Sequence, residues 1–103
     1  MSETSQSIKA WGDQTFGKAM DPVKLVERAE IEMAELKDAL AAGDTAEAGK
    51  EAADVAILLH RLMGDLGKDL STEVDAKMAI NRTREWISAG DGTGSHSKKS
   101  PKE

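Results

Sequence analysis

Residues 51–62, EAADVAILLHRL, place a carboxylate in the middle of an apolar helical stripe. At about 100° per residue, one face of a helix collects the residues Val55, Leu58, Leu59 and Leu62. Glu51 falls on the same face, and Asp54 lies at its edge. A buried carboxylate without a partner is costly, so this face must meet something positive or remain partly polar.

The same conflict occurs earlier in the chain, in residues 21–43. Apolar side chains recur there at helical spacing, at Leu25, Ala29, Met33, Leu36 and Leu40. Glu32 lies about 20° from Leu25 on the helical wheel, and Glu35 lies further round at the margin of the stripe. Two predicted helices therefore each bring a pair of carboxylates, at i, i+3 spacing, to the edge of the core.

Capping signals set the bounds of these two helices. In the first, Asp21 is a suitable N-cap, Pro22 fits the first helical position, and Gly43 is placed to end the helix. The second opens with Asp44 and Glu47 at capping-box spacing and closes at Gly64 or Gly67. The short joint between the helices predicts an antiparallel helical hairpin.

A third helix is predicted from Ser71 to Gly90, and no segment carries a strand signal. Residues 8–20 form either a short helix or an irregular arm, and residues 1–7 are polar and expected to be loose. From Ser88 to the end the chain is rich in Gly, Ser and Lys, which predicts a disordered tail over residues 88–103. We therefore expect an all-α fold with one helical domain, residues 1–87.

Composition narrows the class of protein. The chain has 103 residues, a net charge of −5 and no cysteine. Net acidity argues against a general nucleic-acid binder, and no apolar run approaches the roughly 20 residues of a membrane span. The start of the chain lacks the pattern of a secretory signal, so a cytoplasmic location is the default expectation.

The two carboxylate pairs suggest a metal site. Oxygen ligands without His or Cys suit a hard cation such as Mg²⁺ or Mn²⁺, and magnesium commonly shares its remaining positions with substrate phosphates. The alternative is that the four side chains are ordinary exposed residues, with Lys37, Lys50 or Arg61 as partners.

The predicted third helix carries a polar stripe of opposite charge. Lys77, Asn81 and Arg84 recur at i, i+4 and i+7, which on a continuous helix places them within about 60° of one another. Two cations and an amide on one stripe suit a phosphate group. The alternative is a solvated face.

The doubled motif resembles that of a known family. It reads Glu32-Met33-Ala34-Glu35, fifteen intervening residues, then Glu51-Ala52-Ala53-Asp54. This pattern is similar to the metal motif of the all-α nucleoside triphosphate pyrophosphohydrolases, the MazG-like group. EAADVAILLHRL followed by EVDAKMAINRTREW strengthens the likeness, which covers residues 8–87.

The resemblance implies magnesium-dependent hydrolysis of a nucleoside triphosphate between its α and β phosphates, which yields a monophosphate and pyrophosphate. It implies that Glu32, Glu35, Glu51 and Asp54 are metal ligands or, in one case, the base that orients water. Lys77, Asn81 and Arg84 would hold phosphates. The segment WGDQTFG also looks like the start of MazG-like chains, and Trp11 or Phe16 would stack on the base, unless both only cap the apolar end of the bundle.

Three helices cannot easily enclose four carboxylates and a triphosphate, and chains of the MazG-like group pack into four-helix arrangements between subunits. We therefore expect a homodimer or homotetramer.

The resemblance thus implies an enzyme of housecleaning or nucleotide-pool control. Two other functions are possible for the same sequence. One is phosphoribosyl-ATP pyrophosphohydrolase activity, within the same superfamily. The other is a non-enzymatic helical interaction module, antitoxin-like or regulatory, whose acidic residues are merely exposed.

Overall fold

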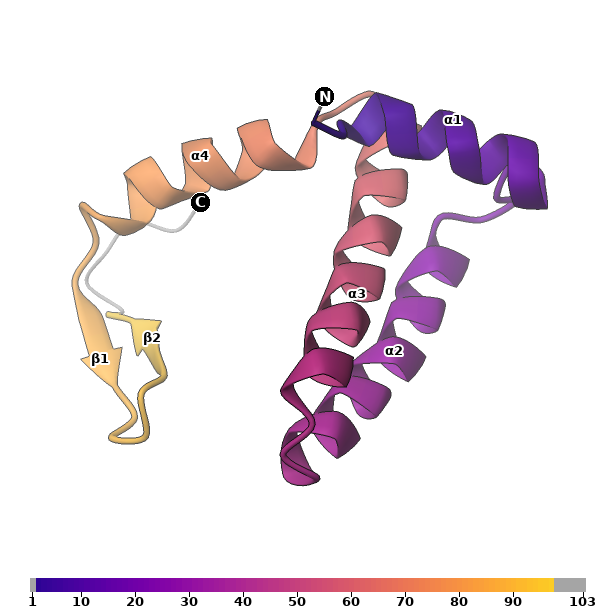
Figure 1. The fold of residues 1–103 in the computed structure, drawn as a ribbon. Coiled ribbons are helices and arrows are strands. Elements are labelled where there is room, and N and C mark those ends of the chain that lie inside the picture. Colours follow the sequence, from indigo (N-terminus) through magenta and orange to yellow (C-terminus); the bar gives the residue numbers. More distant parts are fainter. Residues whose placement is uncertain (1, 98–103) are drawn as a thin grey trace. The chain divides into compact units, whose positions relative to one another are not determined.

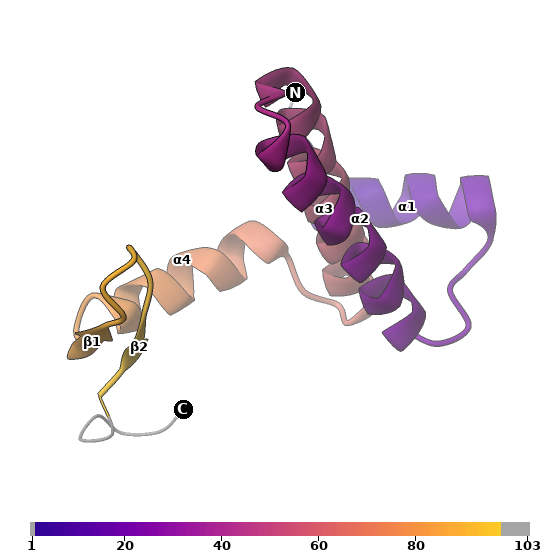
Figure 2. The same cartoon turned by 90° about the horizontal axis from the view of Figure 1, so that it is seen from below.

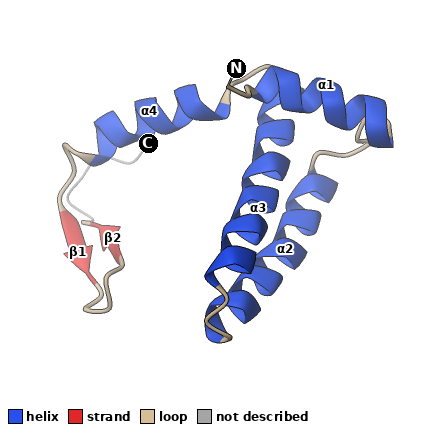
Figure 3. Cartoon of the chain, viewed as in Figure 1, coloured by secondary structure: helices blue, strands red, loops and turns tan. Residues whose placement is uncertain are grey.

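The computed structural model describes residues 2–97, which form mostly helices. The elements, in chain order, are α1 (Ser5–Phe16), α2 (Val23–Ala41), α3 (Thr45–Asp65), α4 (Leu70–Asn81), β1 (Trp86–Ser88) and β2 (Gly94–His96) (Figure 1). Helix dominates the described chain, and the strands form one small hairpin (Figure 3). The predicted all-α class is therefore confirmed. Among the described residues no helix has the length and apolarity needed to cross a membrane.

Contacts divide the chain between Thr72 and Glu73 into two compact units. The first contains α1, α2 and α3, and the second contains most of α4 and the hairpin of strands. The boundary expected at residue 87 remains a prediction.

The predicted helical hairpin of α2 and α3 is confirmed, and the two helices lie side by side and antiparallel in both views (Figure 1; Figure 2). Gly43 takes a positive φ of 71°, and the next amide, of Asp44, donates back to the carbonyl of Ala39 at 3.0 Å. This geometry closes α2. The Asp44 carboxylate then accepts from the amide of Glu47 at 3.0 Å and so caps α3.

The helix α1 lies across one end of this hairpin and packs against α3 (Figure 1). Of the two alternatives for residues 8–20, the short helix is correct up to Phe16. The looseness expected of residues 1–7 is wrong for Ser5 onward. Thr4 and Ser7 form a capping box, in which each side chain accepts from the other residue's backbone amide at 3.0 and 2.8 Å.

Ser5 ties three parts of the first unit together, and it is fully buried. Its hydroxyl oxygen accepts from the amide of Leu70 at 2.8 Å, so its own proton is available to Nδ1 of His60, 2.9 Å away. The Ser5 amide donates to the Asp69 carboxylate at 3.1 Å. The hydroxyl thus joins the first turn of α1 to α3 and to the start of α4.

Few apolar side chains are buried within residues 2–97. They are Ile8, Leu25, Ala29, Ala39 and Ala48. Met33 and Leu40, which the sequence placed on the buried stripe of α2, are 50% and 61% exposed. The face of α2 that meets α3 instead runs through Glu32 and Ala39, so part of the apolar stripe remains at the surface.

The predicted third helix is shorter than expected at its far end. α4 starts earlier than Ser71 because the Asp69 carboxylate, not Ser71, accepts from the amide of Thr72, at 3.2 Å. It ends at Asn81, whose carbonyl accepts from the indole N–H of Trp86 at 2.8 Å. The predicted extension to Gly90 is wrong.

Residues 86–96 form an antiparallel hairpin, where the sequence predicted the end of the third helix and, from Ser88, a disordered tail. Trp86 pairs with His96, and Ser88 pairs with Gly94. Trp86 and Ile87 are residue types that favour strands, and Gly90 and Gly92 supply the positive φ angles of the turn. The disorder expected from Ser88 is thus not found through residue 97, and residues 98–103 lie outside the described chain.

The contact between α1 and α3 depends on the absence of a side chain at Gly64. A Cβ at Gly64 would lie 2.8 Å from the carbonyl oxygen of Ser5 and 2.6 Å from Cβ of Lys9, whereas one at Gly49 would meet nothing. Gly64→Ala should therefore lower the free energy of unfolding by about 1–3 kcal/mol. Gly49→Ala, in the same helix, should raise it by up to about 1 kcal/mol. Urea denaturation of both variants measures the difference, and equal stabilities would show that α1 does not pack on α3 here.

Candidate metal site and adjoining pocket

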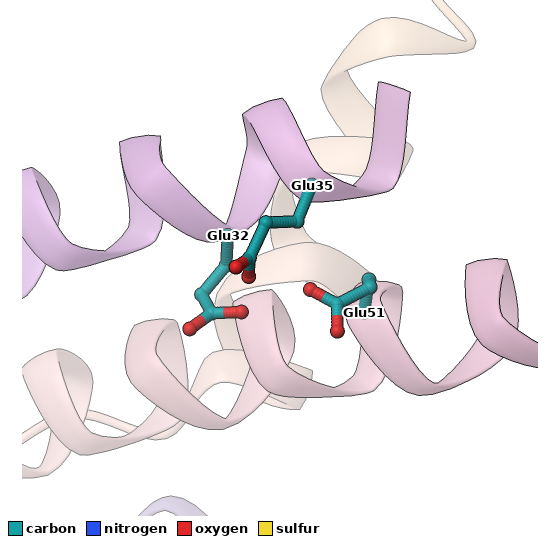
Figure 4. Close-up of side chains that lie close together, drawn as sticks. All are labelled: Glu32, Glu35 and Glu51. Carbon is teal, nitrogen blue, oxygen red and sulfur yellow. The ribbon is translucent and has the colours of Figure 1, made fainter. Parts of the chain in front are cut away.

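Three carboxylates meet between α2 and α3. Glu32 and Glu35 project from α2 toward Glu51 of α3, and one oxygen from each lies within 4.8 Å of the others (Figure 4). Glu32 and Glu51 are only 8% and 9% exposed, whereas Glu35 is exposed at the edge of the group. The predicted inward orientation of Glu32 and Glu51 is therefore confirmed.

The crowding of these groups changes their affinity for protons. Hydrogen bonding to Glu35 is the main cause that raises the pKa of Glu51 to about 8, and burial and Glu32 act in the same direction. The pKa of Glu32 is lowered, chiefly by hydrogen bonding to Glu35 and also by Arg28, whose guanidinium lies 3.2 Å from the Glu32 carboxylate. Without a cation, one proton is thus held on Glu51 near neutral pH.

The donor set fits a hard divalent cation. All three ligand candidates offer carboxylate oxygens, which Mg²⁺ and Mn²⁺ accept. Oε2 of Glu51 is buried and has no hydrogen-bond partner within residues 2–97. A buried acceptor without a partner is costly, and a cation between the helices would satisfy it.

Asp54, the fourth predicted ligand, is not part of this close group. It is exposed on α3 and lines, together with Glu32, a pocket of about 590 Å³ beside the carboxylates. The structure thus brings three predicted ligands together and places the fourth on the wall of the adjoining pocket. Its role as a ligand remains a prediction.

The pocket has an aromatic side. Trp11 and Phe16, which the sequence suggested for base stacking, both line it, with their ring centres 5.6 Å apart in an edge-to-face arrangement. They are 53% and 70% exposed, so neither serves only to fill the core. Leu25, Ile57 and Leu58 add apolar surface from α2 and α3.

Arg61 lines the pocket, whereas its sequence position suggested only a partner for the carboxylates. It is 7% exposed, and its guanidinium lies 5.7 Å from the centre of the Phe16 ring. It donates to the carbonyl of Gly17 at 2.6 Å and to the Asp13 carboxylate at 3.4 Å. A Cβ at Gly12 would lie 2.5 Å from its Nε. Arg61 therefore fixes the end of α1 against α3, a long-range contact without a local sequence signal.

Lys77, Asn81 and Arg84 belong to the second unit and do not form one helical stripe. Lys77 and Asn81 lie on α4, but the helix ends at Asn81 and Arg84 lies in the following turn. The placement of Arg84 on the same helix is therefore wrong. Oδ1 of Asn81 is buried and has no hydrogen-bond partner in the described part of the chain. The phosphate-binding role of the three residues remains a prediction.

Comparison with known proteins gives two curated relatives. The chain is 39% identical over 99 residues to the dATP/dGTP diphosphohydrolase of Salmonella phage PMBT28, an alignment that covers 93% of this chain and 31% of the relative. It is 44% identical over 57 residues to the dATP/dGTP diphosphohydrolase of Cyanophage S-2L, covering 55% of this chain and 54% of the relative.

The chain thus spans about a third and about half of the lengths of these relatives. No family model matches the chain, and no solved structure shows significant similarity to it. The relatives' shared name is consistent with the resemblance to nucleotide pyrophosphohydrolases.

The raised pKa of Glu51 predicts how the metal-free protein responds to pH. Because the folded protein holds this proton more tightly than the unfolded chain, the stabilisation is complete below the ordinary pKa of a glutamate and is lost as pH rises through about 8. In EDTA, the wild-type melting temperature should fall by several degrees between about pH 5 and 9.

Glu51→Gln should flatten this decline, because the amide does not titrate. Glu30→Gln, at an exposed position of α2, is the matched control and should keep the wild-type pH dependence. Thermal melts followed by circular dichroism provide the measurement. Equal slopes for wild type and Glu51→Gln would show that Glu51 does not hold the proton.

Proposed function

We propose that the chain is a divalent-cation-dependent nucleotide pyrophosphohydrolase that acts on deoxynucleoside triphosphates, with dATP and dGTP as the first candidates. The observation that carries the proposal is the group of three carboxylates between α2 and α3, in which Glu32 and Glu51 are buried and Glu35 lies at the exposed edge. An enzyme of this class needs a concentrated negative site for a cation beside a pocket for a nucleotide, and the proposal is supported by the three carboxylates that lie beside a pocket of about 590 Å³. The name shared by the two relatives supports the nucleotide substrate.

In this proposal the three glutamates hold Mg²⁺ or Mn²⁺, and Asp54 completes the set from the pocket side. The cation would supply Lewis-acid chemistry, with stabilisation of phosphate charge and activation of water. The reaction itself is an attack of water on the α phosphorus. The bond between that phosphorus and the α–β bridging oxygen breaks, and pyrophosphate leaves with the bridging oxygen.

The aromatic side of the pocket is proposed to receive the base. Trp11 and Phe16 present ring surface there, and stacking on a ring tolerates more than one base. Arg61 holds the Phe16 end of α1 in place, so the aromatic side is fixed relative to α3. Lys77, Asn81 and Arg84 remain candidates for further phosphate contacts.

We further propose that the enzyme is a dimer or tetramer. α2 leaves large apolar side chains exposed along one face, at Val26, Met33 and Leu40. A second copy packed on this face would bury them and complete a four-helix arrangement. Light scattering on the purified protein should give at least twice the monomer mass, and a monomer would contradict this part of the proposal.

A substrate panel tests the proposed reaction. Deoxy- and ribonucleoside triphosphates and phosphoribosyl-ATP are incubated with Mg²⁺, and the products are identified by mass spectrometry. The proposal predicts monophosphate and pyrophosphate from dATP or dGTP. In heavy-oxygen water, the label should enter the monophosphate, because water attacks the α phosphorus. Release of orthophosphate would contradict the reaction class, and label in the pyrophosphate would contradict the attack on the α phosphorus.

Two variants give the panel its control. Glu51→Gln should reduce kcat by about a hundredfold or more, because it removes a ligand charge from the buried group. Glu30→Gln should keep the wild-type rate.

Preference for phosphoribosyl-ATP would favour the alternative of phosphoribosyl-ATP pyrophosphohydrolase activity. Absence of any metal-dependent turnover would favour an interaction module.

A further inference from the structure

The pocket beside the carboxylates is more basic than the chain that forms it. Four basic and two acidic side chains line it, so it carries an excess of two positive charges in a chain whose net charge is −5. The acidic residues are Glu32 and Asp54, and the basic residues are Lys18, Lys24, Arg28 and Arg61. This local excess of positive charge favours an anionic ligand.

The four basic side chains differ in how far ion pairs and hydrogen bonds within the protein already occupy them. Arg61 is buried and committed to Gly17 and Asp13. Lys24 pairs with Glu27 at 3.2 Å, and both side chains are exposed. Arg28 pairs with Glu32 at 3.2 Å, but its side chain remains 60% exposed and its fork has further donors. Lys18 has no ion-pair partner among residues 2–97.

Lys18 and Arg28 also lie at positions in the chain that favour contact with an anion in the pocket. Lys18 follows α1 in the connection that Arg61 holds through the carbonyl of Gly17, so its backbone is anchored next to the pocket. Arg28 lies one turn before Glu32 on α2 and contacts its carboxylate. A polyphosphate that approaches the carboxylate group along this pocket would pass both side chains.

We infer that Lys18 and Arg28 bind the polyphosphate of the substrate. This inference rests on the proposed function for the identity of the substrate, but the anion site itself can be tested alone. It adds two phosphate-binding residues in the first unit to the three that the sequence predicted, which are Lys77, Asn81 and Arg84. Arg61 acts as a positioning residue, because its guanidinium holds the connection that carries Lys18.

The test is the binding of inorganic tripolyphosphate, measured by calorimetry in EDTA so that neither hydrolysis nor a metal contributes. Lys18→Gln and Arg28→Gln should each weaken binding about fivefold or more, and the double variant should weaken it further. Lys37→Gln removes the same charge from an exposed position of α2 outside the pocket and should bind as the wild type does. The side chains of Lys18 and Arg28 are exposed, so their substitution should leave the fold intact, and thermal melts verify the fold of each variant.

The inference is overturned if the wild type fails to bind tripolyphosphate, or if Lys18→Gln and Arg28→Gln bind it as tightly as Lys37→Gln does. It is also overturned if only Lys77→Gln and Arg84→Gln weaken binding. In kinetic assays on dATP or dGTP, Lys18→Gln should raise KM more than it lowers kcat. Tripolyphosphate binding lost in Lys18→Gln, in a protein that hydrolyses no nucleotide, would support the anion site and refute the proposed function.

Discussion

Mutual repulsion of carboxylates inside a helical interface is the constraint on which the rest of the structure depends. α2 and α3 bury Glu32 and Glu51 at the position where two amphipathic helices would ordinarily bury leucine. Such an arrangement costs free energy unless a proton or a cation lies between the oxygens. In the metal-free chain a proton relieves the repulsion, as the raised pKa of Glu51 indicates. A divalent cation would relieve it as well, and a bound cation would also allow the interface to take part in catalysis.

The surroundings of the carboxylates are held by a second set of polar contacts around α1. The hydroxyl of Ser5 joins the first turn of α1 to His60 and Leu70, and Arg61 fixes the other end of α1 through Gly17 and Phe16. These contacts place Trp11 and Phe16 on the wall of the pocket without a large apolar core. A small chain thus uses buried polar groups for positions that a larger domain would fix by apolar packing.

Local signals in the sequence predicted the helical hairpin and the inward carboxylates well. Gly43 and Asp44 determine the turn by backbone conformation and capping, which depend on neighbouring residues only. Contacts between distant segments were not predictable in this way. The bond from Arg61 to Gly17 spans 44 positions, and the strand pairing of Trp86 with His96 competes with a helix that the local pattern also allows. Asp54 was grouped with the other ligands by spacing, but it lies outside their close group and lines the adjoining pocket.

The central claim is that the three glutamates form a divalent-cation site, and a crystal grown with Mn²⁺ tests it most directly. Anomalous scattering locates manganese independently of any assumption about the ligands. An anomalous peak is expected between α2 and α3, within bonding distance of oxygens from Glu32, Glu35 and Glu51. A fully occupied manganese elsewhere, with the three carboxylates bound to no ion, would contradict it.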